Sequence, residues 1–251
     1  MKPSVCRSPN FNQRRASLDM LVLHYTGMHT GEAALARLCD PEAEVSAHYL
    51  VWEDGRITQL VAEDKRAWHA GLGSWQGDTD LNSHSIGIEI VNGGHDVPGA
   101  DGRPVPYPDA QIMAVIELSR DIVDRHAIPQ DRIVGHSDIA PQRKRDPGEH
   151  FPWARLAEQG VGFWPDLAGD APGRVLMGRG LGPGDRGEAV GRLHEELGTI
   201  GYAVPAQAVY QALTEAVVTA FQRRFRPERV TGQADLETIR AIMAVRKLVG
   251  R

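Results

Sequence analysis

Cysteine is scarce in this sequence. Only Cys6 and Cys39 occur in 251 residues. One pair is too few for a disulfide framework in a chain of this length, which excludes the small disulfide-rich secreted folds. We expect two free thiols, as in a protein of a reducing compartment.

Long apolar runs and a strong excess of one charge are also missing. No stretch reaches the roughly 18 apolar residues of a membrane span, and the first six residues lack the apolar core of a signal peptide. A formal net charge of −5 gives no basic signal for nucleic acid or anionic lipid. We therefore expect no membrane span and no nucleic-acid partner. We expect a cytoplasmic location, or a periplasmic one if a signal peptide was removed.

The composition is otherwise that of an ordinary soluble protein, with 41% apolar and 24% charged residues. A chain of this length can bury a sizeable core and form one or two domains. Glycine and proline are frequent in residues 160–184, which indicates a linker between domains rather than part of a core. We predict one domain at 1–165, a linker at 166–180 and a second domain at 181–251.

The first domain alternates strand and helix patterns. Apolar runs predict strands near residues 20–24 and 85–91, and a hairpin of 45–52 with 56–61 around the turn Glu53-Asp-Gly55. Helical spacing predicts helices at 30–38, 109–126 and 153–159, the second capped by Asp109. The predicted fold class is α/β, with a mixed central sheet flanked by helices.

The second domain shows three amphipathic segments. They cover residues 185–197, 214–222 and 235–242, and Thr214 and Asp235 are the expected N-caps of the last two. We predict a small C-terminal three-helix domain.

Three side chains could together bind a metal ion. His24 ends an apolar strand, His136 follows another, and Asp146 lies ten residues further along a loop. Two imidazoles and one carboxylate match the three-ligand pattern of catalytic zinc, which keeps one position for water.

Other ionisable residues each allow a functional and a structural interpretation. Glu89 lies among isoleucines, where a carboxylate is costly unless it is paired or functional, so it could be a general base or part of a buried ion pair. Lys144 lies between two arginines and could be a surface cation. His48 could line a cleft, although a packed strand histidine fits its context better. We expect His84 and His95 to face solvent.

Four motifs taken together resemble the type-2 N-acetylmuramoyl-L-alanine amidases, zinc enzymes related to the peptidoglycan recognition proteins. In order, they are His24-Tyr-Thr26, Trp68-His-Ala-Gly71, Ser85-Ile-Gly-Ile-Glu-Ile-Val-Asn92 and Gly135-His-Ser-Asp-Ile-Ala-Pro-Gln-Arg-Lys-Arg-Asp-Pro-Gly148. The resemblance covers roughly residues 15–155.

This resemblance implies roles for individual residues. It implies that His24, His136 and Asp146 bind Zn2+, that Glu89 activates water, and that Lys144 stabilises an oxyanion. His69, Asn82 and Arg143 become candidate substrate contacts, Arg143 for a carboxylate of the peptide stem.

The second domain resembles the small peptidoglycan-binding domain. The matching residues are Asp185-Arg-Gly, Gly201-Tyr202, Phe221-Gln222 and Thr231-Gly232, whereas Val209-Tyr210-Gln211 departs from the family pattern. The domain could therefore bind cell wall, or could be a packing module that has lost this affinity.

Three functions are compatible with these motifs. One is hydrolysis of the amide between N-acetylmuramic acid and L-alanine in muropeptides, including 1,6-anhydro forms, during cell-wall recycling. A second is an exported or phage-type lytic amidase that acts on intact peptidoglycan. A third is a non-catalytic peptidoglycan receptor. The sequence does not determine the oligomeric state.

Overall fold

The computed structural model describes residues 3–167 and 180–249, which we call the N-terminal and C-terminal units. Most of the predicted linker 166–180 lies outside the described residues. In the N-terminal unit the strands are β1 (Ser4–Val5), β2 (Phe11–Gln13), β3 (Met20–Tyr25), β4 (Tyr49–Val51), β5 (Ile57–Gln59), β6 (Lys65–Ala67), β7 (Ser85–Ile90) and β8 (Ile133–Gly135). Its helices are α1 (Gly31–Cys39), α2 (Leu81–His84), α3 (Asp109–His126), α4 (His136–Ile139) and α5 (Trp153–Glu158), with short 3-10 turns η1 (Pro41–Ala43) and η2 (Gln130–Arg132). The C-terminal unit holds α6 (Glu188–Ile200), α7 (Ala212–Phe225) and α8 (Leu236–Arg246).

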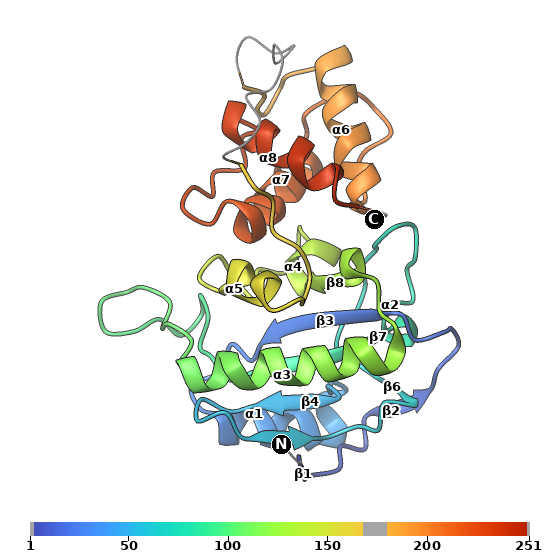
Figure 1. The fold of residues 1–251 in the computed structure, drawn as a ribbon, viewed down its shortest axis with the longest axis vertical. Coiled ribbons are helices and arrows are strands. Elements are labelled where there is room, and N and C mark those ends of the chain that lie inside the picture. The colour runs from blue at the N-terminus through green and yellow to red at the C-terminus, as the bar shows by residue number, and fades with distance from the viewer. Residues whose placement is uncertain (1–2, 168–179, 250–251) are drawn as a thin grey trace.

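A six-stranded mixed sheet organises the N-terminal unit (Figure 1). Its order is β1-β5-β4-β7-β3-β8, and β2 pairs with β6 in a separate two-stranded ribbon. β4 and β5 form the predicted antiparallel hairpin, whereas β7 runs parallel to both β3 and β4. The predicted mixed α/β sheet with flanking helices is confirmed.

The two faces of the sheet carry different partners because successive side chains of a strand point to opposite sides. Leu21 and Leu23 of β3 share a core with α3 and α5. Met20 and Val22 point the other way and join a core that includes α6, α7 and α8. By the same alternation, His24 belongs to the face that carries Met20 and Val22.

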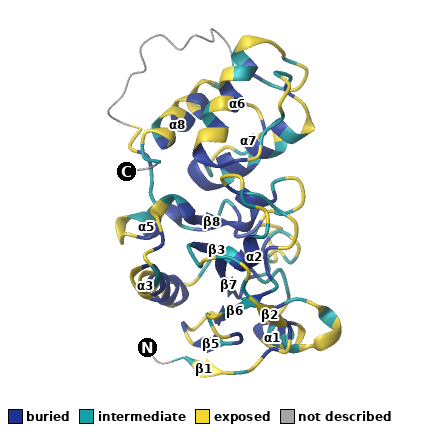
Figure 2. Ribbon diagram, turned by 90° about the vertical axis from the view of Figure 1, so that its right-hand side faces the viewer, coloured by how far each residue is buried: buried dark blue, intermediate teal, exposed yellow. Residues whose placement is uncertain are grey.

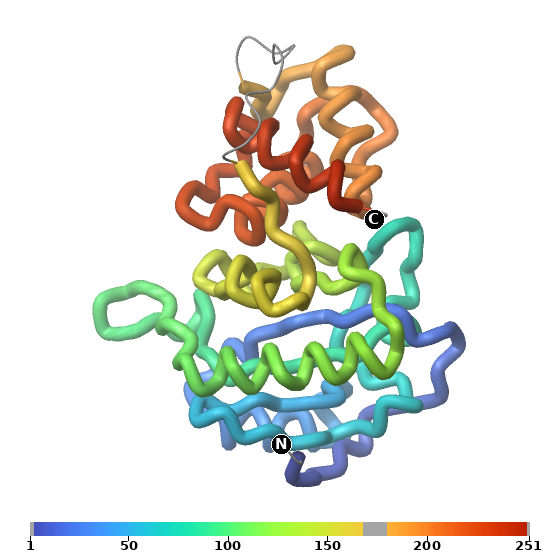
Figure 3. The backbone as a smooth tube through the Cα atoms, in the orientation of Figure 1, coloured from blue at the N-terminus to red at the C-terminus, as the bar shows by residue number. Residues whose placement is uncertain are grey.

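The C-terminal unit packs directly on the N-terminal unit. Trp75, Val134 and Ile139 share one core with Tyr202 and Phe221 of the C-terminal unit. Figures 2 and 3 show the helices of this unit stacked over α4, α5 and β8, with buried segments on both sides of the boundary. The three predicted C-terminal helices are present.

Two predicted caps differ from the structure, and one is confirmed. Asp235 caps α8 and accepts from the backbone N–H of Thr238. Thr214 does not cap α7, because that helix begins at Ala212 and the Thr214 side chain is buried against His194. Asp109 is the first residue of α3 rather than its cap, which is Pro108.

Two further sequence-based expectations concern the cysteines and membrane-spanning helices. Cys6 and Cys39 are free, as predicted, with their sulfur atoms 3.6 Å apart. Within residues 3–167 and 180–249, no helix has the length and apolar character required to cross a membrane.

Candidate functional site

A cavity of about 370 Å³ opens at the carboxyl ends of β3 and β7. Its lining includes Glu89, His136, Lys144 and Asp146. Parallel strands place their carboxyl ends at one edge of the sheet, so His24 on β3 and Glu89 on β7 occupy paired positions in the register. The loop after β8 brings His136 and Asp146 to the same edge.

His24, His136 and Asp146 converge on one point. Nδ1 of His24 lies 2.9 Å from Nδ1 of His136, and the two nitrogens lie 3.1 and 3.0 Å from Oδ2 of Asp146. All three side chains are buried. The fold therefore brings the three predicted metal ligands together in one cluster that could hold a metal ion.

The hydrogen bonds of His136 leave its inner nitrogen free to bind a cation. Nε2 of His136 lies 3.0 Å from the carbonyl oxygen of Ala70, which can only accept. Nε2 therefore carries a proton, and Nδ1 is the nitrogen that faces the centre of the triad.

A longer chain of hydrogen bonds sets the same state in His24. Ser85 donates its hydroxyl to the carbonyl oxygen of Leu81 at 2.6 Å, so its oxygen accepts from Nε2 of His69 at 3.2 Å. Nδ1 of His69 then accepts from Nε2 of His24 at 3.0 Å. This chain leaves Nδ1 of His24 unprotonated and aimed at the triad. Such outer partners of a ligating histidine fix its tautomer and ring orientation.

His69 and Asn82 are thus used inside the protein. His69 borders the cavity, but both ring nitrogens are engaged by His24 and Ser85. Asn82 does not line the cavity, and its side-chain oxygen accepts from the backbone N–H groups of His69 and Ala70. In this structure the polar groups of both side chains therefore hold residues around the metal ligands, and the predicted substrate contacts of His69 and Asn82 stay a prediction.

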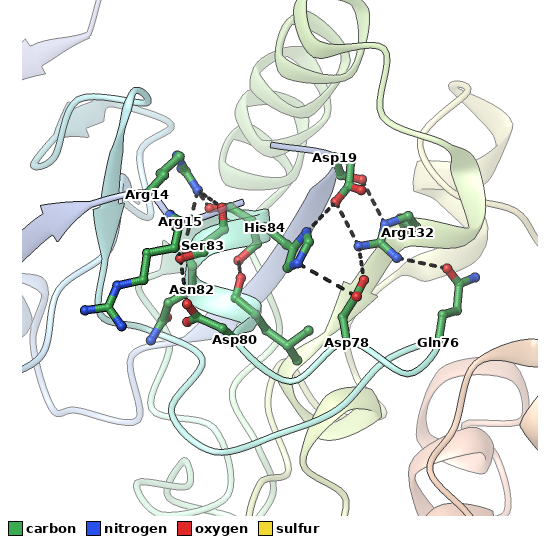
Figure 4. Close-up of polar contacts among 12 residues, drawn as sticks. Arg14, Arg15, Asp19, Gln76, Asp78, Asp80, Asn82, Ser83, His84 and Arg132 are labelled. Atoms are coloured by element: carbon green, nitrogen blue, oxygen red, sulfur yellow. Dashed lines mark hydrogen bonds and ion pairs between the residues drawn. The ribbon is translucent and has the colours of Figure 1, made fainter. Parts of the chain in front are cut away.

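Two arginines fix the segment that carries Asn82 and Ser85 (Figure 4). Arg14 donates to the carbonyl oxygens of Ser83 and Ser85 at 2.8 and 2.9 Å. Arg132 binds both Asp19 and Asp78, at 2.8 and 2.9 Å. The segment 78–85, which supports His69 through Asn82 and Ser85, is therefore held by Arg132 at Asp78 and by Arg14 at Ser83 and Ser85.

Two histidines that were expected to face solvent are instead paired. His84 lies between Asp19 and Asp78, at 3.4 and 3.8 Å. His95 contacts Glu149 at 3.0 Å and the hydroxyl of Tyr25 at 3.0 Å. His48 is fully buried, accepts from the N–H of Gly87 and lies outside the cavity lining, as its packed interpretation predicts.

The electrostatics of the triad suit a divalent cation. Burial, and then the neighbouring His136, lower the pKa of His24 to about 4, so the ring is neutral near pH 7. Burial alone would raise the pKa of Asp146, but His136 and His24 outweigh it and hold the carboxyl ionised. Two imidazole nitrogens and one carboxylate oxygen thus face one another at about 3 Å. The donor set therefore fits Zn2+, for which N and O ligands are usual.

Glu89 faces the cavity with an unused acceptor. Its Oε2 atom is buried and has no hydrogen-bond partner. Burial, followed by the nearby charge of Asp146, raises the pKa of Glu89 well above its ordinary value, and Lys144 opposes this shift. The alternative of a buried ion pair is not what the structure shows, since no ion pair joins Glu89 to another described residue.

The two candidate cations of the loop differ in their surroundings. Lys144 lines the cavity, and among the described residues its ammonium group has no hydrogen-bond or ion-pair partner. Arg143 also lines the cavity, but it donates to the carbonyl oxygens of Ala70 and Leu72. Lys144 is thus free to act on a bound ligand, whereas Arg143 partly serves to join the loop to residues 70–72.

Sequence reasoning missed the supporting residues Ser85, Gly87 and Asp138. Gly87 leaves room for His69, because a Cβ atom there would lie 2.4 Å from Cγ of that ring. Its place two residues before Glu89 in a strand is the one available signal, since glycine in a strand often marks a close approach.

Two family models match the chain. The N-acetylmuramoyl-L-alanine amidase model covers residues 13–149. The peptidoglycan binding domain model covers residues 186–242. The two matches fall in the N-terminal and C-terminal units respectively.

Two relatives from Escherichia coli match different lengths of the chain. The N-acetylmuramoyl-L-alanine amidase AmiD of Escherichia coli is 41% identical over 235 residues, which are 88% of this chain and 79% of AmiD. The 1,6-anhydro-N-acetylmuramyl-L-alanine amidase AmpD of Escherichia coli is 38% identical over 154 residues, which are 55% of this chain and 79% of AmpD.

Solved structures agree with these matches. The complex of Escherichia coli AmiD with anhydro-N-acetylmuramic acid-L-Ala-D-γ-Glu-L-Lys superposes with a TM-score of 0.77 at 39% identity, over 95% of this chain and 93% of AmiD. AmpDh3 from Pseudomonas aeruginosa superposes with a TM-score of 0.76 at 34% identity, over 93% of each chain. With its mixed sheet, its convergent triad and these matches, the chain belongs to the N-acetylmuramoyl-L-alanine amidase family.

Proposed function

We propose that this chain is a zinc-dependent amidase that hydrolyses the amide between N-acetylmuramic acid and L-alanine in muropeptides, including 1,6-anhydro forms. The observation that carries the proposal is the convergence of His24, His136 and Asp146 beside the unpartnered carboxylate of Glu89. Two of the similar structures support the substrate class, since AmiD is bound to an anhydromuramyl peptide and AmpDh3 to an anhydromuramic pentapeptide.

His24, His136 and Asp146 would hold the zinc ion. When bound, zinc polarises a carbonyl group and acidifies water. The protein's contribution is the orientation of both histidines, which the carbonyl oxygen of Ala70 and the His69–Ser85 chain fix so that each Nδ1 faces the ion.

Glu89 and Lys144 would carry the proton and charge steps. Glu89 takes a proton from the attacking water, for which its raised pKa is suited, and returns it to the leaving amine of L-alanine. Lys144, which faces the cavity and has no partner among the residues described, donates to the carbonyl oxygen as negative charge develops there. Arg143 lies on the same wall and would contact a carboxylate of the peptide stem.

The proposed domains correspond to the two matched families. Residues 1–165 would form the hydrolytic domain, residues 166–180 a linker, and residues 181–251 a helical domain of the peptidoglycan-binding type. The complete triad with Glu89 and Lys144 favours hydrolysis over a non-catalytic receptor.

We place the enzyme in cytoplasmic cell-wall recycling, acting on soluble muropeptides. A lytic amidase that acts on intact peptidoglycan is the second candidate, favoured by the match of residues 186–242 to a peptidoglycan binding domain. The two candidates differ in the substrate that they cleave.

Mass spectrometry of reaction products separates these functions. Soluble anhydro-muropeptide and purified sacculi are each incubated with zinc-loaded and with chelator-treated protein. Zinc-dependent release of free peptide from the soluble substrate alone supports recycling. Release from sacculi as well supports the lytic function, and release from neither substrate would overturn the proposed hydrolysis.

A further inference from the structure

One buried carboxylate links the C-terminal unit to the loop of His136. Asp138 lies in α4, two residues after His136, and is 1% exposed. It does not line the cavity, so it does not touch bound substrate. The contacts of Asp138 can therefore influence where the loop of His136 lies, but Asp138 takes no direct part in the reaction.

Asp138 accepts three hydrogen bonds from described residues, and two of them come from the C-terminal unit. Within its own turn, Oδ2 accepts from the N–H of Gly135 at 2.8 Å. From the C-terminal unit, the hydroxyl of Tyr202 donates to Oδ1 at 2.6 Å and Arg224 donates to Oδ2 at 3.0 Å. A buried carboxylate is costly unless such donors satisfy it. The conformation of this turn therefore depends on Arg224 of α7 and on Tyr202, which follows α6.

Arg224 strengthens the connection by binding the adjacent strand. Its second terminal nitrogen donates to the carbonyl oxygen of Ile133 in β8 at 2.8 Å. Its guanidinium group also lies over the ring of Trp153, 4.5 Å from the ring centre. The side chain is 3% exposed, so these contacts are shielded from water.

The same turn is bonded to the third ligand. The N–H of Ser137 donates to the carbonyl oxygen of Asp146 at 2.9 Å. A shift of residues 135–138 would therefore move both His136 and Asp146. Only His24, on the rigid β3, would stay in place.

We propose that the C-terminal unit is a positioning part of the metal centre, which acts through Tyr202 and Arg224 on Asp138 to hold the turn that carries His136. This inference rests on the proposed function for the identity of the metal. It assigns the C-terminal helices a role that does not require them to bind cell wall. Tyr202 and Arg224 are positioning residues, because neither lines the cavity.

Paired tyrosine variants test the proposal. Tyr202→Phe removes the hydroxyl that donates to Asp138. Tyr210→Phe is the matched control, since its hydroxyl is equally buried and donates at 2.6 Å to the carbonyl oxygen of Gly232, inside the C-terminal unit. Competition with a chromophoric chelator then gives the zinc affinity of each full-length protein. We expect about tenfold weaker zinc binding in Tyr202→Phe, the lower end of effects seen for outer partners of metal ligands, and wild-type affinity in Tyr210→Phe.

Hydrogen–deuterium exchange of the metal-free proteins gives a second readout. Amides of residues 133–140 should exchange faster in Tyr202→Phe and Arg224→Lys than in wild type and Tyr210→Phe. Lysine keeps the charge of Arg224 but cannot reproduce its two directed donors. Equal zinc affinity and equal exchange in Tyr202→Phe and Tyr210→Phe would overturn the proposal. Neither measurement uses substrate, so a wild-type protein that binds zinc but hydrolyses no muropeptide would refute the proposed function and leave this test intact.

Discussion

The carboxylate of Glu89 offers the sharpest test of the chemistry at the scale of one residue. Glu89→Gln keeps the shape of the side chain but removes the group that accepts a proton. We expect the turnover number to fall by roughly 10²–10⁴, the usual contribution of general acid–base catalysis. Zinc content should not change, because Glu89 is not one of the three converging ligands.

Turnover of an anhydro-muropeptide and zinc content by atomic absorption check this expectation. Glu117→Gln on the exposed side of α3 makes the same chemical change away from the cavity and should leave both quantities unaltered. Normal turnover in Glu89→Gln would exclude Glu89 as the base.

At this scale the sequence predicts the ligands better than their supports. The three ligand candidates can be named because each follows an apolar strand or lies in one short loop. The His24–His69–Ser85 chain cannot be predicted in this way, because it depends on ring orientations and on which nitrogen carries the proton. The sequence therefore predicts substrate contacts for His69 and Asn82, whereas in the structure His69 bonds the ligand His24 and Asn82 bonds the backbone of His69.

Strand β7 must pass close to His69, and this constrains Gly87. A Cβ atom at Gly87 would lie 2.4 Å from the His69 ring, so Gly87→Ala must displace that ring. We expect destabilisation by about 1–3 kcal/mol, as for other overpacked cores. Zinc binding should also weaken, because His69 holds His24. Urea unfolding and chelator competition measure the two effects, and unchanged zinc affinity would argue against the role of His69.

Helix α6 offers the opposite result for the same substitution. Gly191 lies inside α6, and an added Cβ atom would meet only Cβ of Ala208 at 3.6 Å, an ordinary contact. Alanine is favoured over glycine inside a helix by about 0.5–1 kcal/mol. We expect Gly191→Ala to raise the free energy of unfolding by about that amount in urea titrations. A loss of stability would mean that α6 packs more tightly than the structure shows.

Helices and strands with a regular spacing of apolar residues can be predicted from the sequence, whereas the residues at which they begin and end are harder to predict. The pattern of residues 109–126 predicts α3, although the helix begins at Asp109 rather than after it, and the hairpin of β4 and β5 follows from its Asp-Gly turn. Thr214 was expected to cap a helix because threonine often does so. In the structure its hydroxyl bonds His194 in the core and the helix starts earlier, so tertiary packing overrides the local preference.

The docking of the two units belongs to the scale of the whole molecule. The apolar faces of α6 and α7 predict that these helices are buried, but not what covers them. Tyr202 and Phe221 could equally well have filled a core confined to the C-terminal unit. Their contact with Trp75 and Ile139 depends on the matching shape of a surface about 60–150 residues earlier in the chain, which no local pattern encodes.

Burial of neutral histidines should make the whole fold sensitive to acid. Burial, and then the charge of Arg14, lower the pKa of His48 to about 3 from an ordinary value of 6.5. Between these two values the unfolded chain binds a proton that the folded chain does not. The free energy of unfolding therefore falls as pH drops from about 6.5 towards 3 and is unaffected by this group above that range. For one such group the loss between pH 7 and pH 5 is about 2 kcal/mol.

Urea unfolding at pH 7, 6 and 5 measures this slope, and the window lies above the ordinary pKa of carboxyl groups. His48→Gln lowers stability at pH 7, because the bond from the N–H of Gly87 to the ring is lost. Its stability should nevertheless change less with pH than that of wild type, by about 2 kcal/mol over the window. His29→Gln, at an exposed position, removes an imidazole without disturbing the core and is the matched control. Parallel pH slopes for wild type and His48→Gln would show that His48 takes up its proton without unfolding, so that acid sensitivity must come from other groups.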